Sequence, residues 1–122
     1  MKFYLIDDDW DMIKYLTTLL ETGGHTVYSG VSGVSNLPKI VARQPDVILV
    51  DLVMGEMDGL ELVGQLRARG ELAKSKIIMV TSKDHDHWRK QADEAGVDGY
   101  ITKPVNEDTF VSQIEEISRP GE

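Results

Sequence analysis

The stretch that decides the fold is Asp-Val-Ile-Leu-Val-Asp at residues 46–51. Its four central residues are all apolar, which is typical of a short strand that is buried on both faces. Such a strand belongs to a parallel sheet with helices packed on either side. Because the stretch ends on an aspartate, the strand is expected to bring the carboxylate of Asp51 to the edge of the sheet.

The same alternation of an apolar run and a helical segment occurs five times along the chain. Strands are expected at 3–6, 25–29, 47–50, 76–80 and 99–102. Helical spacing of apolar residues follows each of them, and the predicted helices cover about 10–20, 35–43, 60–66, 88–95 and 110–117. The second helix is expected to be capped by Ser35 or Ser32, with Pro38 in its first turn.

Five β–α units predict an α/β fold in which a five-stranded parallel sheet is doubly wound with five helices. Right-handed crossovers favour the strand order 2-1-3-4-5, a flavodoxin-like three-layer sandwich. Ligands of such sheets bind beyond the carboxyl ends of the strands, where the order reverses between strands 1 and 3. The polar residues that follow strands 1, 3, 4 and 5 are Asp7 and Asp8, Asp51, Thr81 and Ser82, and Lys103.

Composition excludes several classes of function. The chain has 122 residues, a length that predicts one domain, and it has no cysteine, so disulfides and thiolate metal sites are excluded. The formal net charge of −8 and the absence of a basic stripe argue against direct binding of nucleic acid. No stretch predicts a signal peptide or a membrane span, so a cytoplasmic location is expected.

Three carboxylates that meet at one sheet edge repel each other, so a compensating cation is expected. Mg²⁺, or Mn²⁺ in its place, suits this set of oxygen ligands, and Lys103 adds a second positive group. Calcium is disfavoured because the chain has no twelve-residue loop with spaced acidic ligands. An exposed carboxylate beside a cation, a lysine and a hydroxyl is suited to accept a phosphoryl group.

Five short motifs carry a resemblance to a known family. They are Tyr-Leu-Ile-Asp-Asp-Asp at 4–9, Asp-Val-Ile-Leu-Val-Asp at 46–51, Met-Asp-Gly at 57–59, Val-Thr-Ser at 80–82 and Gly-Tyr-Ile-Thr-Lys-Pro at 99–104. Their order and spacing resemble the receiver domain of two-component response regulators, the CheY-like superfamily, from about residue 2 to residue 118. The resemblance implies a receiver domain at 1–118, with 119–122 as the start of a linker or a C-terminal tail.

The resemblance also implies a role for each matching residue. Asp51 would be the phosphoacceptor, and Lys103 would contact the phosphoryl group. Asp8 would ligate Mg²⁺ directly, with Asp7 as a second ligand or a water-mediated partner. The main-chain carbonyl of Val53 would complete the protein ligands.

Further implications concern switching and partners. Thr81 would be the switch hydroxyl and Tyr100 the switch aromatic, and the peptide between Lys103 and Pro104 would be cis. A histidine kinase or phosphotransfer protein would donate the phosphoryl group, and an output domain or downstream protein would receive the signal. The domain would catalyse its own phosphotransfer and dephosphorylation without being a turnover enzyme. Phosphorylation-dependent homodimerisation through the helix 4 to helix 5 face is a hypothesis from the same resemblance.

One residue departs from the family pattern. The family usually has proline four residues after the acceptor aspartate, and this chain has Gly55 there. Glycine removes a fixed φ from the loop, so kinase docking or the lifetime of the phosphoryl group is expected to change. Val53 and Lys83 stand at positions that vary in the family and are associated with the dephosphorylation rate.

Structural roles compete with functional ones at several positions. Asp9 is expected to be the N-cap ahead of Trp10, and Asp58 a cap rather than a metal ligand. Trp10 is expected to pack at the mouth of the site or on the first helix. The Asp-His-Asp-His run at 84–87 is expected to be a solvated helix start, because residues two apart do not share a helix face. Thr81 could alternatively cap the fourth helix.

Two other functions fit parts of the pattern. A phosphohydrolase with an aspartyl-phosphate intermediate would need a second acidic group two residues after the nucleophile, where this chain has Val53. A degenerate receiver that acts only as a scaffold would not be expected to retain all five chemical positions. The phosphoacceptor switch is therefore the favoured interpretation.

Overall fold

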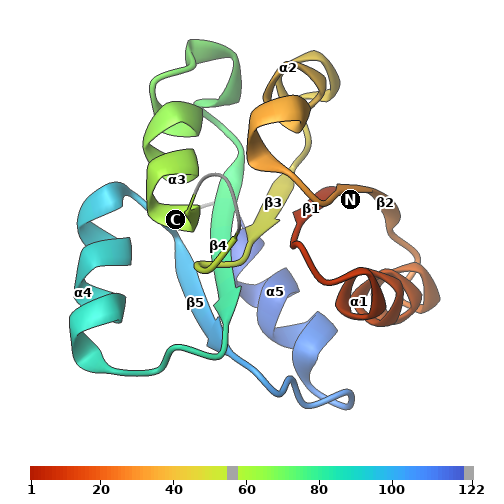
Figure 1. The fold of residues 1–122 in the computed structure, drawn as a ribbon. Coiled ribbons are helices and arrows are strands. Elements are labelled where there is room, and N and C mark those ends of the chain that lie inside the picture. Colours follow the sequence, from red (N-terminus) through yellow and green to blue (C-terminus); the bar gives the residue numbers. More distant parts are fainter. Residues whose placement is uncertain (55–57, 120–122) are drawn as a thin grey trace.

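The computed structural model describes residues 1–54 and 58–119. Its sheet has five parallel strands in the order β2-β1-β3-β4-β5 (Figure 1), which confirms the order predicted from the sequence. The strands are β1 (Lys2–Ile6), β2 (Thr26–Gly30), β3 (Val47–Val50), β4 (Lys76–Thr81) and β5 (Gly99–Thr102). The strand order reverses between β1 and β3, so their carboxyl ends flank the expected site.

Helices cover both faces of the sheet and complete the predicted three-layer sandwich (Figure 1). They are α1 (Trp10–Thr22), α2 (Gly33–Arg43), α3 (Gly59–Arg67), α4 (Asp86–Ala95), α5 (Phe110–Ser118) and the short 3₁₀ helix η1 (Gly70–Leu72). One face packs against α2, α3 and α4, and the other packs against α1 and α5. Among the described residues, no helix has the length and apolar character needed to cross a bilayer.

The two cores are separated by the alternation of side chains along β3. Ile48 and Val50 point to the layer of α2, α3 and α4, and Val47 and Leu49 point to the layer of α1 and α5. All four side chains are buried. Each contributes on the order of 1.5–3 kcal/mol of transfer free energy. The strand that carries Asp51 is therefore held rigidly from both sides.

The boundaries differ from the predicted ones mainly at helix starts. Ser32, not Ser35, is the N-cap position of α2, so Pro38 lies in the middle of the helix rather than in its first turn. The alternation that predicted a strand at 25–29 is shifted by one residue, because β2 pairs with β1 from Thr26 onward. The helix η1 was not predicted, since three residues carry no periodicity. α5 ends at Ser118, and residues 120–122 of the predicted tail lie outside the described residues.

Candidate functional site

Three aspartates meet at the carboxyl ends of β1 and β3. Asp7 and Asp8 follow β1, Asp51 follows β3, and one carboxylate oxygen of each lies within 4.8 Å of the others. Backbone hydrogen bonds extend the sheet to this point. The N–H of Asp51 donates to the carbonyl of Ile6 at 3.0 Å, and the N–H of Asp7 donates to the carbonyl of Gly30 at 3.3 Å. The sheet itself thus places the three carboxylates together.

The three carboxylates differ in their exposure. Asp7 is buried, with 4% of its surface accessible, whereas Asp51 is half-buried and Asp8 is exposed. The second oxygen of Asp7, Oδ1, accepts a hydrogen bond from the N–H of Asp9 at 3.0 Å. Asp7 is therefore oriented by the protein, while Asp8 is the member of the cluster that is open to solvent.

Asp9 stands apart from this cluster and begins α1. Its Oδ1 accepts hydrogen bonds from the N–H groups of Asp11 at 3.0 Å and Met12 at 3.4 Å. These bonds satisfy donors that a helix N-terminus leaves without intrahelical partners. The prediction that Asp9 is a cap is confirmed.

Lys103 brings a positive charge from the end of β5. Its ammonium group lies 2.7 Å from Oδ2 of Asp7 and 3.5 Å from Oδ2 of Asp51. The backbone N–H of Lys103 donates to the carbonyl of Thr81 at 2.8 Å, and the peptide bond to Pro104 is cis, as expected. One ammonium group faces three carboxylates, so two negative charges remain uncompensated when all three are ionised.

The pKa of Asp51 is raised above its usual value. Burial of its carboxylate is the largest cause, and the neighbouring charge of Asp7 adds to it. Lys103 opposes this effect most strongly, followed by hydrogen bonds from the Thr81 hydroxyl and from the backbone N–H of Val53, which lies 3.4 Å from Oδ1. The site therefore holds a carboxylate whose ionisation is not fully compensated by the protein.

The donor set fits a small hard cation. Octahedral Mg²⁺ with oxygens at 2.0–2.1 Å places adjacent ligands about 2.9 Å apart and opposite ligands about 4.2 Å apart. Carboxylate oxygens within 4.8 Å of each other reach this geometry by a small contraction, or with water between one aspartate and the ion. A divalent cation would also offset the two uncompensated charges. Asp7, Asp8 and Asp51 are thus the residues that could hold it.

Thr81 and Tyr100 lie on a route from the site toward α4 and β5. Thr81 is fully buried at the end of β4, and its Oγ1 accepts a hydrogen bond from the N–H of Lys83 at 3.4 Å. The hydroxyl of Tyr100, in β5, donates a hydrogen bond to the carbonyl of Lys83. The guanidinium of Arg89 lies 4.6 Å from the centre of the Tyr100 ring. Since α4 begins at Asp86, with His85 as its N-cap, the alternative of Thr81 as a helix cap is wrong.

Two further predictions near the site have different outcomes. Asp58 is the N-cap of α3 and accepts a hydrogen bond from the N–H of Glu61 at 2.8 Å, so its structural role is confirmed. Trp10, by contrast, is 57% exposed, so the packing predicted for it is not found. It is the first residue of α1, and its ring has no helical turn before it to cover it.

Sequence reasoning missed Gly59, the first residue of α3. A Cβ at this position would lie 2.2 Å from the carbonyl oxygen of Asp51 and 2.9 Å from the Cα of Leu52. The N–H of Gly59 also donates to the carbonyl of Leu52 at 2.7 Å. The start of α3 is therefore packed directly on the backbone of the acidic residue. A glycine straight after a capping aspartate was the available signal.

The run at 84–87 is exposed and α4 begins within it, at Asp86, so the prediction of a solvated helix start is confirmed. Within residues 1–54 and 58–119, the candidate metal cluster of three or more acidic, histidine or cysteine side chains is that of Asp7, Asp8 and Asp51. Gly55, which stands where the family pattern has proline, lies outside the described residues.

Comparisons with known proteins agree with this geometry. Residues 3–115 match the response regulator receiver domain family. The chain is 31% identical to protein PilH of Pseudomonas aeruginosa over 113 residues, which cover 93% of each chain. It is 30% identical over 121 residues to the alkaline phosphatase synthesis transcriptional regulatory protein PhoP of Bacillus subtilis, but it spans only about half of that protein.

Solved structures support the same fold. The Vibrio cholerae chemotaxis protein CheY4 superimposes with a TM-score of 0.90 at 24% identity, over 95% of this chain and 97% of that one. A CheY-like receiver domain protein from Methanospirillum hungatei superimposes with a TM-score of 0.88 at 27% identity, over 96% and 92% of the two chains. The match of the family over nearly the whole chain, together with the acidic edge of a sheet of this order, shows that the chain belongs to the response regulator receiver domain family.

Proposed function

We propose that this domain is a signalling switch that accepts a phosphoryl group on Asp51 in a reaction that depends on Mg²⁺. The observation that carries the proposal is the arrangement of Lys103, whose ammonium group lies between Asp7 and Asp51. The ammonium group of Lys103 offsets one of the three carboxylate charges, and the two remaining negative charges would attract a divalent metal ion. Receiver domains bind Mg²⁺ at such an acidic pocket.

Each side chain has a distinct part in the transfer. Asp7, whose orientation is fixed by Asp9, and the more exposed Asp8 would hold the ion, and the carbonyl of Val53 would be a further ligand. The bound ion would neutralise charge on the oxygens of the transferring phosphoryl group. An Asp51 carboxylate oxygen forms the new bond to phosphorus as the bond from phosphorus to the donor breaks. The leaving group keeps that electron pair, and the product is an acyl phosphate.

Lys103 and Thr81 would stabilise the product. The ammonium group lies near enough to Asp51 to pair with a phosphoryl oxygen. The Thr81 hydroxyl, which already bonds to Asp51, would donate to the same group. Phosphorylation adds close to two negative charges at one point. A movement of Thr81 would then change its hydrogen bond with the N–H of Lys83. The carbonyl of Lys83 accepts the hydroxyl of Tyr100, so Tyr100 would be affected in turn.

This route suggests where partners act. A change at Lys83 and Tyr100 alters the surface of α4 and β5, where Arg89 packs on the aromatic ring and donates to the hydroxyl of Thr102 at 2.7 Å. We assign the output, an output domain or a downstream protein, to this face, and a phosphorylation-dependent homodimer would use it together with α5. A histidine kinase or a phosphotransfer protein is the proposed donor, and loss of the phosphoryl group is catalysed by the same domain.

Incubation with acetyl phosphate tests the proposal. The expected result is a gain of one phosphoryl group by intact mass spectrometry, which requires Mg²⁺ and is absent from the Asp51→Asn variant. Asp9→Asn is the matched control, because asparagine also caps a helix and this carboxylate lies outside the cluster. Folded protein that gains no mass with Mg²⁺, or an Asp51→Asn variant that still gains it, would overturn the assignment.

A further inference from the structure

A pocket separate from the acidic cluster lies at the β2 edge of the sheet, beside α2. It has a volume of about 620 Å³, within the range of small-molecule sites. Its lining residues belong to the first half of β1, to the outer strand β2 and to the second half of α2. Figure 1 shows where these three elements lie. Its lining residues are Lys2, Tyr4, Tyr28, Ser29, Lys39, Ala42 and Arg43. We refer to it as the β2–α2 pocket.

Secondary structure brings its side chains together. Lys39, Ala42 and Arg43 are spaced three and four residues apart, so they share one face of α2. Tyr4 and Tyr28 are partners in the parallel register of β1 and β2, and their rings stack with centroids 6.4 Å apart. Between Lys39 and Arg43, Ala42 adds only a methyl group to the lining.

The charge of this pocket is opposite to that of the protein. Three of its seven lining residues are basic and none is acidic, in a chain of net charge −8. The Arg43 guanidinium lies 3.9 Å from the centre of the Tyr28 ring. Lys2 donates from its ammonium group to the carbonyl of Arg43 at 2.8 Å, which leaves two of its three donors. In the described part of the chain, none of the three basic side chains forms an ion pair.

Asp46 is the acidic residue that comes near. Its carboxylate accepts the backbone N–H of Lys2 at 2.7 Å, and it lines the neighbouring pockets at the amino ends of the strands. It does not line the β2–α2 pocket. Asp46 therefore reduces the positive charge of the β2–α2 pocket near Lys2, but it does not cancel the charges of Lys39 and Arg43.

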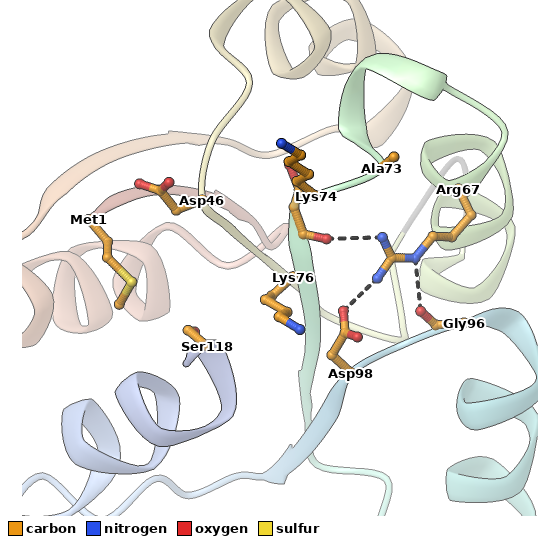
Figure 2. Close-up of a pocket in the computed structure, with 10 residues that line it drawn as sticks. Met1, Asp46, Arg67, Ala73, Lys74, Lys76, Gly96, Asp98 and Ser118 are labelled. Carbon is orange, nitrogen blue, oxygen red and sulfur yellow. Dashed lines mark hydrogen bonds and ion pairs between the residues drawn. The ribbon is translucent and has the colours of Figure 1, made fainter. Parts of the chain in front are cut away.

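A larger pocket at the amino end of the sheet shows what a compensated cation looks like. Figure 2 shows Arg67 there, with a hydrogen bond to the carbonyl of Gly96 and an ion pair with Asp98. Arg67 also donates to the carbonyl of Ser75 at 2.9 Å. Two carboxylates, those of Asp46 and Asp98, line that pocket. The donors of its arginine are engaged by Gly96, Ser75 and Asp98, so Arg67 has a structural explanation, although Lys74 and Lys76 also line that pocket.

Helix stability accounts for only part of the β2–α2 pocket. Arg43 lies in the last turn of α2, and Lys2 bonds to its carbonyl, so both favour the negative end of the helix dipole. Lys39 lies a turn earlier on the same face, and the stacked tyrosines have no part in that role. The guanidinium lies over the Tyr28 ring, a contact that favours one position of the side chain before any ligand arrives.

We propose that the β2–α2 pocket binds a small phosphorylated ligand that carries at least two negative charges. Ammonium groups and a pre-positioned guanidinium are the donors that phosphate oxygens prefer. Arg43 is exposed, so its guanidinium could also stack on a planar base, and a nucleotide is a candidate as well as an inorganic phosphate chain. The site does not depend on phosphorylation of Asp51.

Titration calorimetry with pyrophosphate and with ADP, both without Mg²⁺, tests this site. Saturable binding of either probe is expected, at one ligand per chain and weaker at higher salt. A double Lys39→Gln, Arg43→Gln variant should bind at least tenfold more weakly. The matched control is Lys14→Gln, Arg69→Gln, which removes the same charge from exposed positions elsewhere. ADP that binds more tightly than pyrophosphate would show that the base is also recognised.

Two results would overturn the proposal. The first is no heat of binding for either probe at millimolar concentration. The second is an equal loss of affinity in the control variant, which would show attraction to surface charge without a site. Both double variants should still accept phosphate from acetyl phosphate, which separates this proposal from that for Asp51. Circular dichroism checks that each variant is folded.

Discussion

The two ends of the sheet each hold a partly buried cation among oxygen atoms, but they balance its charge differently. At the amino end, Arg67 donates to the carbonyls of Gly96 and Ser75, each at 2.9 Å, and pairs with Asp98. Asp98 in turn accepts the N–H of Ile77 at 2.8 Å. At the carboxyl end, Lys103 is shared between Asp7 and Asp51, and its distance to Asp51 is 3.5 Å.

The difference shows how a stabilising cluster differs from a reactive one. Each of the three guanidinium nitrogens of Arg67 donates to a protein oxygen (Figure 2). The one carboxylate there, that of Asp98, accepts hydrogen bonds from Arg67 and from the N–H of Ile77. The carboxyl end has more anions than its lysine neutralises, and the pKa of Asp51 is raised as a result of burial and of Asp7. Incomplete compensation costs stability, and under the proposed function it is what prepares the cluster for a metal ion.

The largest expected effect comes from removing each cation in turn. Lys103→Met should lower the rate of phosphorylation by acetyl phosphate about 100-fold or more, because a charge that stabilises the transferring oxygens is lost. Arg67→Met should leave that rate unchanged but lower the free energy of unfolding by about 3 kcal/mol, because a partly buried carboxylate and two carbonyls lose their donor. Mass spectrometry and urea unfolding measure the two effects.

The distinction between the two ends of the sheet would be wrong if Lys103→Met and Arg67→Met had the same effects on phosphorylation and stability. An Arg67→Met variant that is phosphorylated slowly while still folded would mean that the amino end also supports the chemistry. Mg²⁺ gives a further distinction between the ends. It should restore part of the stability that Lys103→Met loses, since the ion supplies the missing charge, and none of the loss in Arg67→Met.

A second large effect is expected where α3 meets the site. In Gly59→Ala, the new methyl group would lie 2.2 Å from the Asp51 carbonyl oxygen, and that backbone cannot move without disturbing β3. The free energy of unfolding should fall by about 1–3 kcal/mol, the usual cost of overpacking, and phosphorylation should slow.

The matched control is in the same helix. Gly64 has no heavy atom within 4 Å of an added Cβ, so Gly64→Ala should raise the stability by up to about 1 kcal/mol through helix propensity. Urea unfolding of both variants measures the difference. A Gly59→Ala protein as stable as the Gly64→Ala protein would show that the close packing on Asp51 is not rigid.

The sequence predicted the carboxyl end far better than the amino end. The three aspartates follow the apolar strands β1 and β3, and Lys103 follows the short strand β5. Parallel strands all end at one edge, so the meeting of these residues follows from the fold. Arg67 and Asp98 lie 31 residues apart, within a helix and in a loop, and no periodicity connects them. Their pairing depends on how α3 packs beside β5, which is a property of the tertiary structure.

Helix ends and individual exposures were also hard to predict. Ser32 and Ser35 both have the chemistry of a cap, and the choice between them depends on where β2 delivers the chain. Trp10 is apolar and was expected to pack, but its position at the very start of α1 leaves it open to solvent. Asp9, in contrast, was predicted correctly because its capping role is local.

Mg²⁺ should stabilise the carboxyl end and with it the whole domain. A ligand that binds only the folded state at 100 times its dissociation constant adds about 2.7 kcal/mol to the free energy of unfolding. This gain should appear in the wild type and in Arg67→Met alike, and should largely vanish in Asp8→Ala. Thermal unfolding with and without the ion measures it. An equal gain in Asp8→Ala would place the ion elsewhere.

The smallest effect is the pH dependence that Asp51 contributes in the absence of metal. Its pKa is higher in the folded protein than in the unfolded chain, chiefly through burial, so at intermediate pH the folded state binds more protons. Stability from this group is fully present below its unfolded pKa and is lost as the pH rises through its folded pKa. Asp51→Asn does not titrate and escapes this loss. It should therefore be more stable than the wild type at neutral pH, and the advantage should shrink as the pH falls toward the ordinary aspartate value.

Urea unfolding between neutral and acid pH, with EDTA present, measures the difference between the two proteins. Gly64→Ala serves as the control, because it changes no titrating group and its difference from the wild type should stay constant with pH. A difference for Asp51→Asn that is equally constant would mean that Lys103 and the hydrogen bonds from Thr81 and Val53 offset burial completely. The carboxyl end would then be as well compensated as Arg67, and its affinity for a cation would have to come from geometry alone.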